Sequence, residues 1–430
     1  MASRLLSSTT MMTMASPARP PSPRPVLLEE DRNWSTLPEE LLEHIGKMLP
    51  SRRDAFSFRS MCSGWRAALP FTKFFAPMLM MLPFCPNSPD IAVTFFTAAD
   101  GGETTFTRNL PSLRGKTLRG SSRGWLAFVD EAGYVTLLNP LTGATVELPP
   151  ADERVLAASY YHYTFPDGNW VILPAVRGQH EWVRLEDMKK SEIFREIVLS
   201  SSSPGSGDCV AMAALAESST VAFCRVGVDV AWTLLDTNVP KSCVTSVVHF
   251  GGSRFLAIFN GHSGRFVSPE VAVVGAISIC DVAGSSPTAT WIRSLHAAPK
   301  KKSDWACKYM QVNGELYLVT SKVPGCTNLC RVYKSNIFSR RPKWMRVKNA
   351  PGVTLFVSTN FTKGDSEGAA SVSGFKENSI YCMDYSTDHN QLQLKIIDIA
   401  NGTSEFRPFH GKIQLDSAGT LCWIQPNHWK

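Results

Sequence analysis

The chain has 430 residues, of which 44% are hydrophobic and 19% are charged, so most of it can bury a core and it is long enough for more than one domain. The formal net charge is only +7, and the basic residues are dispersed along the sequence, which argues against a dedicated nucleic-acid-binding protein. No apolar run approaches the roughly 18 residues that a membrane-spanning helix needs. We therefore expect neither nucleic acid nor a membrane as a partner.

The 11 cysteines are an odd number and are spread from Cys62 to Cys422 without the paired spacings of zinc sites or disulfide frameworks. The nearest two, Cys326 and Cys330, have no second pair beside them. We interpret the cysteines as buried, small apolar side chains of a protein in a reducing compartment. The sequence predicts no metal site, and no cofactor-binding motif is present.

Residues 1–30 form a leader of distinct composition. It contains Arg4, Arg19 and Arg24, has no acidic residue before Glu29, and is too rich in proline between residues 17 and 25 to be helical there. Two interpretations stay open. The leader is either disordered, in a protein of the nucleus or cytoplasm, or it is a transit peptide for a chloroplast or mitochondrion.

From Trp34 to Leu69 the hydrophobic spacing is helical. Pro38 suits the first position of a helix, where its missing N–H has no partner to lose. The apolar residues that follow recur at spacings of one and three and predict a single apolar stripe; they are Leu41, Leu42, Ile45, Met48 and Leu49. Pro50 is expected to end this helix.

A second predicted helix begins after Ser51, which is expected to form a capping box with Asp54. Its apolar residues are Phe56, Phe58, Met61 and Cys62. Gly64 is expected to break it, and Trp65 to open a last short helical piece that ends at Pro70. A helix of about 12 residues is marginally stable alone, and three such pieces bury little apolar surface. We therefore expect a partner surface to complete this segment.

After Pro70 the pattern changes to short strands separated by turns. The stretch GWLAFVDEAGYVTLLNPLTGATVELPP, which starts at Gly124, holds three such runs, with turns at residues 131–133 and 139–143. The same pattern recurs in ISICDVAGSSPTATWIRSL and LKIIDIANGTSEFRPF. About 340 residues of this kind exceed one β-sandwich and favour a β-propeller. No strict repeat is visible, so the sequence does not reveal the number of blades.

Residues 34–70 resemble an F-box. The matching features, in chain order, are Leu37-Pro38, Leu41-Leu42, Ile45, Leu49-Pro50, Asp54, Arg59-Ser60, Met61-Cys62 and Trp65-Arg66. Three positions differ from the usual pattern: Met61 stands where Val is usual, Ala55 where Leu is usual, and Gly64 is uncommon. These departures bear on affinity for a partner rather than on the identification.

Residues 80–426 are similar to the KIB-type β-propeller, a domain that follows the F-box in many plant proteins. The stretches that carry this resemblance are GSSRGWLAFVDEAGYVTLLNPLTGATVELP, YMQVNGELYLVTSK, GFKENSIYCMDY and CWIQPNHW. The resemblance implies a plant protein with a small all-α F-box domain at 34–70 and a large all-β propeller at 80–426.

The combined resemblance implies a non-enzymatic subunit of a ubiquitin ligase. In this family the F-box binds a Skp-type adaptor, and through it a cullin, while the propeller binds a protein substrate, which here is unknown. The residues expected to contact the adaptor are Leu37, Pro38, Leu41, Leu42, Ile45, Leu49, Met61 and Trp65. As an alternative, about half of them pack only inside the protein.

Two other functions have some support in the sequence. The first is an organellar or cytosolic propeller with a ligand-binding or structural role and a vestigial F-box, which stays open. The second is a hydrolase with Ser122 as nucleophile, because GSSRG fits the G-x-S-x-G pattern. That pattern needs a helix after the serine, whereas WLAFV predicts a strand, so a turn between strands is favoured and no catalytic residue is expected.

The short basic runs and the tryptophans of the β region are both interpreted as structural features. Lys300–Lys302 and Arg340–Lys343 are expected to be solvated loops rather than nuclear-import or anion-binding patches. Most tryptophans are expected in the core and between blades rather than in a ligand channel.

Overall fold

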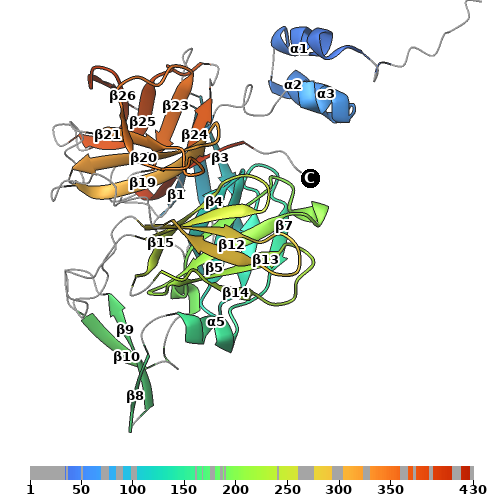
Figure 1. The fold of residues 1–430 in the computed structure, drawn as a ribbon. Helices are drawn as coiled ribbons and strands as arrows, with labels where there is room; N and C mark the ends of the chain where they lie inside the picture. The colour runs from blue at the N-terminus through green and yellow to red at the C-terminus, as the bar shows by residue number, and fades with distance from the viewer. Residues whose placement is uncertain are drawn as a thin grey trace, which may run out of the picture. The chain divides into compact units, whose positions relative to one another are not determined.

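The computed structural model divides the chain into two compact units, Met1–Ala68 and Leu69–Lys430 (Figure 1). It describes residue 34 and residues 37–49, 52–68, 77–83, 91–97, 104–159, 162–166, 168–174, 180–184, 187, 190–239, 242–259, 276–292, 304–322, 330–358, 367–370, 374–386, 391–408 and 418–426. The predictions for the leader 1–30, the cap at Ser51, the ends at Pro50 and Pro70, and the Lys300–Lys302 loop lie outside these residues.

The first unit contains three helices: α1 (Glu39–Lys47), α2 (Arg52–Ser60) and α3 (Ser63–Ala68). Pro38 stands at the N-cap of α1, where its carbonyl accepts hydrogen bonds from the backbone N–H groups of Leu41 and Leu42, both at 3.1 Å. Helix α3 packs against both α1 and α2. The prediction of a helical segment is confirmed, but the boundary between its second and third helices differs from the expected one.

Helix α2 ends before Met61 and Cys62, which were expected inside it. The Ser60 hydroxyl donates to the backbone carbonyl of Ser57 at 2.7 Å, and such local side-chain bonds compete with the continuing helix. Helix α3 then begins at Ser63. Gly64 therefore lies in the first turn of α3 and does not separate the two helices. Glycine is tolerated there because the first N–H groups of a helix have no intrahelical partners.

The second unit is a β-propeller with six blades among the described residues, numbered here in chain order. Blade 1 contains β4 (Lys116–Ser122), β5 (Trp125–Asp130), β6 (Val135–Leu138) and β7 (Thr145–Leu148). Blade 2 contains β11 (Phe194–Leu199), β12 (Val210–Leu215), β13 (Thr220–Arg225) and β14 (Thr233–Asp236). Blade 3 contains β15 (Val244–His249), β16 (Arg254–Phe259), β17 (Ala276–Asp281) and β18 (Thr288–Trp291).

Blade 4 is a four-stranded meander like blades 1 to 3, whereas blade 5 has five strands and blade 6 joins strands from both ends of the propeller sequence. Blade 4 contains β19 (Asp304–Val312), β20 (Glu315–Lys322), β21 (Arg331–Ser335) and β22 (Met345–Val347). Blade 5 has the strand order β24-β23-β25-β26-β27, with bounds Glu367–Ala370, Val353–Val357, Ser379–Ser386, Gln391–Asp398 and Ser404–Pro408. Blade 6 combines β28 (Ala418–Ile424) with β1 (Met78–Pro83), β2 (Ala92–Thr97) and β3 (Thr104–Asn109).

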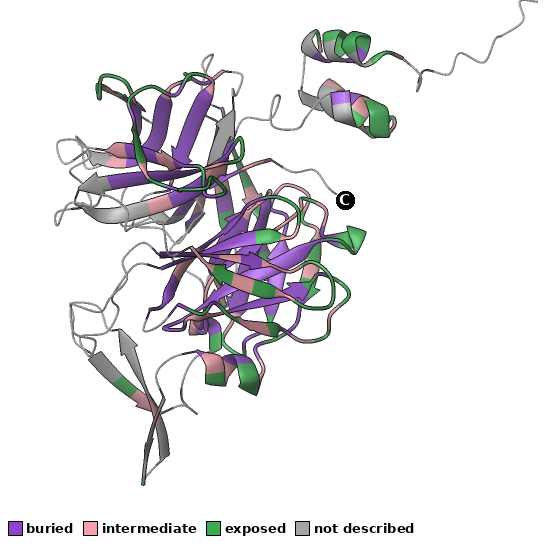
Figure 2. Cartoon of the chain, in the orientation of Figure 1, coloured by how far each residue is buried: buried purple, intermediate pink, exposed green. Residues whose placement is uncertain are grey.

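Hydrophobic clusters between neighbouring blades close the ring. One cluster joins blades 1 and 2, and the others join blades 2 and 3, 3 and 4, 4 and 5, 5 and 6, and 6 and 1. Figure 2 shows the buried residues concentrated in the strands and the exposed residues in the turns. Trp125, Trp232 and Trp423 are fully buried in these clusters, which confirms the expectation of core tryptophans for these three.

Blade 6 is completed by the two ends of the propeller sequence. Strand β28 pairs antiparallel with β1, with Trp423 opposite Leu79 and Cys422 opposite Met80. The Trp423 ring lies 5.0 Å from the ring of Phe356 in blade 5. The C-terminal strand thereby links the last blade to the first strands of the domain.

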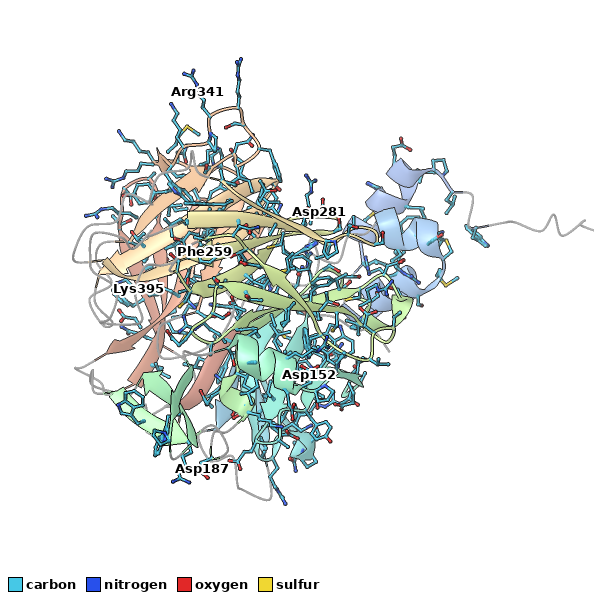
Figure 3. All side chains as sticks on the ribbon, turned by 60° about the horizontal axis from the view of Figure 1, so that its bottom comes forward. Asp152, Asp187, Phe259, Asp281, Arg341 and Lys395 are labelled. Carbon is cyan, nitrogen blue, oxygen red and sulfur yellow. The ribbon has the colours of Figure 1, made fainter. Side chains whose placement is uncertain are left out.

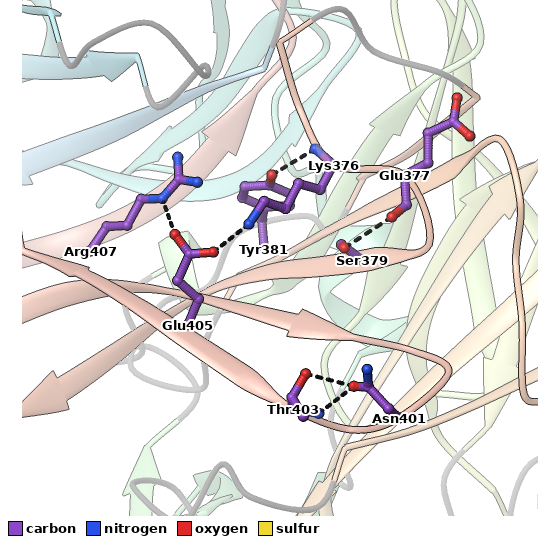
Figure 4. Close-up of polar contacts among 8 residues, drawn as sticks. All are labelled: Lys376, Glu377, Ser379, Tyr381, Asn401, Thr403, Glu405 and Arg407. Atoms are coloured by element: carbon purple, nitrogen blue, oxygen red, sulfur yellow. Dashed lines mark hydrogen bonds and ion pairs between the residues drawn. The ribbon is translucent and has the colours of Figure 1, made fainter.

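Several turns of the blades lie at the glycine and asparagine residues from which turns were predicted. Gly133 and Gly143 adopt positive φ values of 89° and 80° in the β5–β6 and β6–β7 turns, as predicted from the turn signals. In blade 5, Asn401 accepts hydrogen bonds from Thr403 in the β26–β27 turn, and Glu405 pairs with Lys376 and Arg407 (Figure 4). Side-chain and glycine geometry therefore fix these hairpins locally.

The link between blades 1 and 2 holds elements that the sequence did not predict. They are the short helix α5 (Glu153–Ala158) and a separate three-stranded sheet of β8 (His162–Phe165), β9 (Gly168–Pro174) and β10 (His180–Arg184). The Asp152 carboxylate caps α5 by accepting the Val155 N–H at 2.9 Å. Because these elements are inserted between blades 1 and 2, the blades do not follow one another at a constant spacing in the sequence.

Candidate functional site

Helix α1 has two distinct apolar faces. Leu42 is only 3% exposed, and together with Gly46 and the half-buried Leu49 it faces inward. Leu41, Ile45 and Met48 follow at spacings of four and three residues, which places them along one side of the helix. They are exposed, Ile45 at 37% and Met48 at 68%.

The second apolar area of this unit surrounds Trp65. Its ring lies 4.5 Å from the buried ring of Phe58, and its indole N–H donates to the carbonyl of Trp34 at 2.8 Å. Trp65 is thus half-buried and held in place from two sides. Met61, in the connection between α2 and α3, is exposed.

Reciprocal hydrogen bonds join α2 and α3. Arg59 donates to the Arg66 carbonyl at 3.0 Å, and Arg66 donates to the Arg59 carbonyl at 3.3 Å. Burial, and secondarily the nearby Arg66, lower the pKa of the Arg59 guanidinium from its ordinary value. These bonds fix the helix pair that carries Met61 and Trp65.

The predicted contact residues therefore fall into three groups. Pro38, Leu41, Ile45 and Met61 are exposed, Leu37, Leu49 and Trp65 are half-buried, and Leu42 is buried. Met48 is the most exposed apolar residue of α1, yet sequence analysis placed it only within a general stripe. Its spacing from Leu41 does not separate the outward side from the inward side, because Leu42 and Leu49 are also seven residues apart.

A second candidate surface lies where β4, β11 and β15 end together. The Ser122 hydroxyl accepts the Leu199 N–H at 2.8 Å, and the Arg123 guanidinium donates to Nδ1 of His249 at 2.8 Å. These bonds show that the three strand ends lie at the same end of the propeller. We call this end the β4 end.

Arg123 and His249 form a polar bridge at the β4 end. Since the guanidinium is a donor only, Nδ1 of His249 is the acceptor and its Nε2–H donates to the Gly252 carbonyl at 3.0 Å. Burial lowers the pKa of His249; the Gly252 carbonyl partly opposes this shift, and the Arg123 charge adds to it. The imidazole is therefore held in its neutral form.

Ser122 does not lie on the strand-to-helix turn that presents a nucleophilic serine. It ends β4, and Arg123 and Gly124 follow it with positive φ values of 56° and 80° before β5 begins. The interpretation of GSSRG as a turn between two strands is confirmed. Within the described ranges, no group of three or more His, Cys, Asp or Glu side chains is placed to hold a metal ion, and no helix is long and apolar enough to cross a bilayer.

Of the cysteines whose side chains the structure describes, six are buried and two, Cys62 and Cys330, are half-buried. Burial raises the pKa of Cys280 to about 12 and that of Cys330 to about 11. Both thiols therefore stay protonated at neutral pH, and the burial of Cys280 agrees with the expectation of small apolar core residues.

Comparisons with known proteins identify the family to which the propeller belongs. The family described as KIB1-4 beta-propeller matches residues 95–403. The F-box protein SKIP23 from Arabidopsis thaliana is 34% identical over 137 residues, which cover 30% of this chain and 32% of that protein. The F-box/kelch-repeat protein At1g64840 from the same plant is 45% identical over 57 residues, which cover 13% of this chain and 15% of that protein.

These matches span about a third or less of the relatives' lengths. Among solved structures, TolB from Acinetobacter baumannii aligns with a TM-score of 0.36 and 11% identity over 87% of this chain and 74% of that one, a likeness too low to support a conclusion. The resemblance to plant F-box proteins with a KIB-type propeller is confirmed by the family match and by the Arabidopsis relatives. Because the family match extends over more than half of the sequence, this chain belongs to the KIB1-4 beta-propeller family.

Proposed function

We propose that this protein is the substrate-recognition subunit of a Skp–cullin–F-box ubiquitin ligase. Its helical unit, residues 34–70, binds a Skp-type adaptor and through it a cullin, and its propeller binds the protein to be ubiquitinated. The chain makes no covalent bond itself. It acts by raising the effective concentration of the target near the conjugating enzyme.

The observation that carries this proposal is the outward apolar side of α1. Leu41, Ile45 and Met48 are exposed together on a unit that holds only three short helices in its described part. Exposed apolar side chains that form a contiguous stripe mark protein interaction sites, and helices are commonly bound through residues at spacings of three and four. The F-box names of the relatives support an adaptor as the occupant.

The structure refines which residues we assign to adaptor contact. Leu41, Ile45 and Met48 form the centre, and exposed Met61 contributes from the α2–α3 connection. Pro38 and Leu37 flank the start of α1. Leu42 is assigned to the interior of the unit and Trp65 to its support, so substitutions at these two positions act through folding as well.

The test is binding of the purified full chain to a purified plant Skp adaptor, measured by calorimetry. We expect Ile45→Asp to weaken binding by at least about tenfold, because it removes apolar contact area and buries a charge. His44→Asp is the matched control, since it introduces the same charge at the neighbouring exposed position of α1. It should change affinity by less than about threefold.

Unchanged thermal unfolding of both variants must accompany this result. If wild type and Ile45→Asp bind the adaptor equally, or if wild type does not bind at all, the ligase function is wrong. Import of a reporter fused to residues 1–30 into an organelle, together with no adaptor binding, would instead support a propeller with a vestigial F-box.

A further inference from the structure

Two turns of neighbouring blades meet at the β4 end. In a four-stranded antiparallel meander, the first and third turns lie at the same end of the sheet because successive strands alternate in direction. The β15–β16 turn of blade 3 thus lies at the same end as the β21–β22 turn of blade 4. Their contact is direct: the rings of Phe250 and Phe338 lie 5.4 Å apart, edge to face.

Phe338 is a fixed yet exposed aromatic ring. Besides its contact with Phe250, the guanidinium carbon of Arg254 lies over this ring, 4.7 Å from its centre. The Asn336 side chain accepts the Phe338 N–H at 3.1 Å, and the Asn336 carbonyl accepts the Ser339 N–H at 3.1 Å. Phe338 nevertheless remains 45% exposed. A rigid ring of this kind contacts a partner without a large loss of side-chain entropy.

The rest of this turn is strongly basic. Arg340, Arg341 and Lys343 are exposed, and no acidic residue occurs in the sequence between Glu315 and Asp365. Figure 3 shows Arg341 at the outer edge of the domain, with its side chain directed away from the blades.

The local positive charge is only slightly offset by acidic groups. None of the three turn cations forms an ion pair with a described residue. Asp281, opposite Arg254 in the β16–β17 pairing, accepts the Ser253 hydroxyl at 2.6 Å and lies near the Arg254 charge. Glu315, beside the start of this turn, pairs with Lys334 at 2.8 Å.

We propose that Phe338 and the cations of this turn form a docking surface for an acidic segment of the target protein. Guanidinium groups pair with carboxylates through two parallel hydrogen bonds, and the Phe338 ring accepts an apolar neighbour of those carboxylates. The inference rests on the proposed function and adds the chemical class of the target. A nucleic acid fits less well, because its binding requires positive charge along a groove and several stacking rings.

The test uses the full chain and two fluorescein-labelled nonapeptides. One has four Glu on each side of a Phe, and the other has Gln in place of every Glu. We expect the Glu peptide to bind and the Gln peptide to bind at least about tenfold more weakly. Binding of the Glu peptide should weaken further as salt is raised, because the contact is exposed.

The key variant combines Arg340→Glu with Arg341→Glu. We expect it to weaken binding of the Glu peptide at least about tenfold, since two attractive charges become repulsive. The matched control combines Arg114→Glu with Lys190→Glu, which changes the net charge equally. Arg114 follows β3, and Lys190 contacts the β5–β6 turn through its backbone N–H, so both belong to the opposite end of the blades. The control should lose less than about twofold.

Three outcomes would overturn the inference: equal binding of the Glu and Gln peptides, equal losses in the two charge-reversal variants, or tighter binding of an oligouridylate that is also lost in Arg340→Glu with Arg341→Glu. Adaptor binding is measured on the same samples. Retained adaptor binding without peptide discrimination removes this inference alone, whereas peptide discrimination without adaptor binding removes the ligase function alone.

Discussion

At the scale of single residues, Gly120 is a position where a neighbouring backbone leaves no room for a side chain. A Cβ atom placed on Gly120 would lie 2.0 Å from the carbonyl oxygen of Ile197, so β4 and β11 touch there through their backbones. Neither backbone can move easily, because Ser121 and Ser122 bond to neighbouring blades on either side. The glycine is therefore required by the contact between blades 1 and 2.

We expect Gly120→Ala to destabilise the propeller by about 3 kcal/mol, the upper end of the range for overpacking. The measurement is the free energy of unfolding in urea, followed by circular dichroism. Gly115→Ala is the comparison, because Gly115 has a φ of 67° but open space around its Cβ position. It should cost only about 1 kcal/mol, the penalty for a Cβ in the left-handed region. Equal costs for the two variants would contradict the proposed backbone contact.

His249 makes stability depend on pH. Its pKa is lowered in the folded state, chiefly by burial, so the unfolded chain takes up a proton more readily. Stability is therefore lost as the pH falls below about 6.5, the usual pKa of histidine, until the folded-state pKa is also passed. We expect His249→Gln to show a smaller loss in unfolding temperature between about pH 7.5 and 5.5 than wild type. An identical pH dependence of the two proteins would contradict a lowered pKa of His249 in the folded state.

At the scale of elements, helix α1 shows what a hydrophobic pattern predicts and what it does not. The spacing of its apolar residues predicted a helix and an apolar surface, but not which residues were available to a partner. Leu42 and Ile45 are equivalent in the sequence pattern, yet Leu42 is buried and Ile45 is exposed. The difference depends on where α3 packs, which is a contact between segments and not a property of α1.

The β21–β22 turn shows that a pattern of charged residues is equally limited as a predictor of function. Its cations were interpreted from sequence as a solvated loop, because a short basic run has no chemistry by itself. Only the fold brings Phe250 and Arg254 of another blade onto Phe338 beside that run. The docking inference therefore depends on tertiary contact rather than on the run.

At the scale of the whole molecule, the ring depends on strand β28. This strand supplies Leu421 and Trp423 to the cluster between blades 5 and 6, and Cys422 and Ile424 to the cluster between blades 6 and 1. A propeller that loses this strand loses contacts on both sides of blade 6. Its stability is thus a property of the closed ring and not of separate blades.

We expect Trp423→Ala to destabilise the protein by about 3–5 kcal/mol, because it leaves a large cavity in a closed interface. Trp182→Ala in β10 is the matched control; this tryptophan is 45% exposed and its loss should change stability by less than about 1 kcal/mol. Both are measured by thermal unfolding, and each removes one tryptophan from the fluorescence signal. Similar unfolding temperatures for the two variants would contradict the role of β28 in closure.

The sequence by itself determined the local structure of this protein: a front helical segment, short strands, and glycine turns such as Gly133 and Gly143. It also carried the family resemblance, because its turns and hairpins have recognisable residue patterns over short distances. Only the tertiary structure decided that the described residues form six blades, that β28 pairs with β1, and that Ile45 rather than Leu42 is exposed. These features arise from pairing and packing between segments far apart in the chain, for which no local pattern encodes the partner.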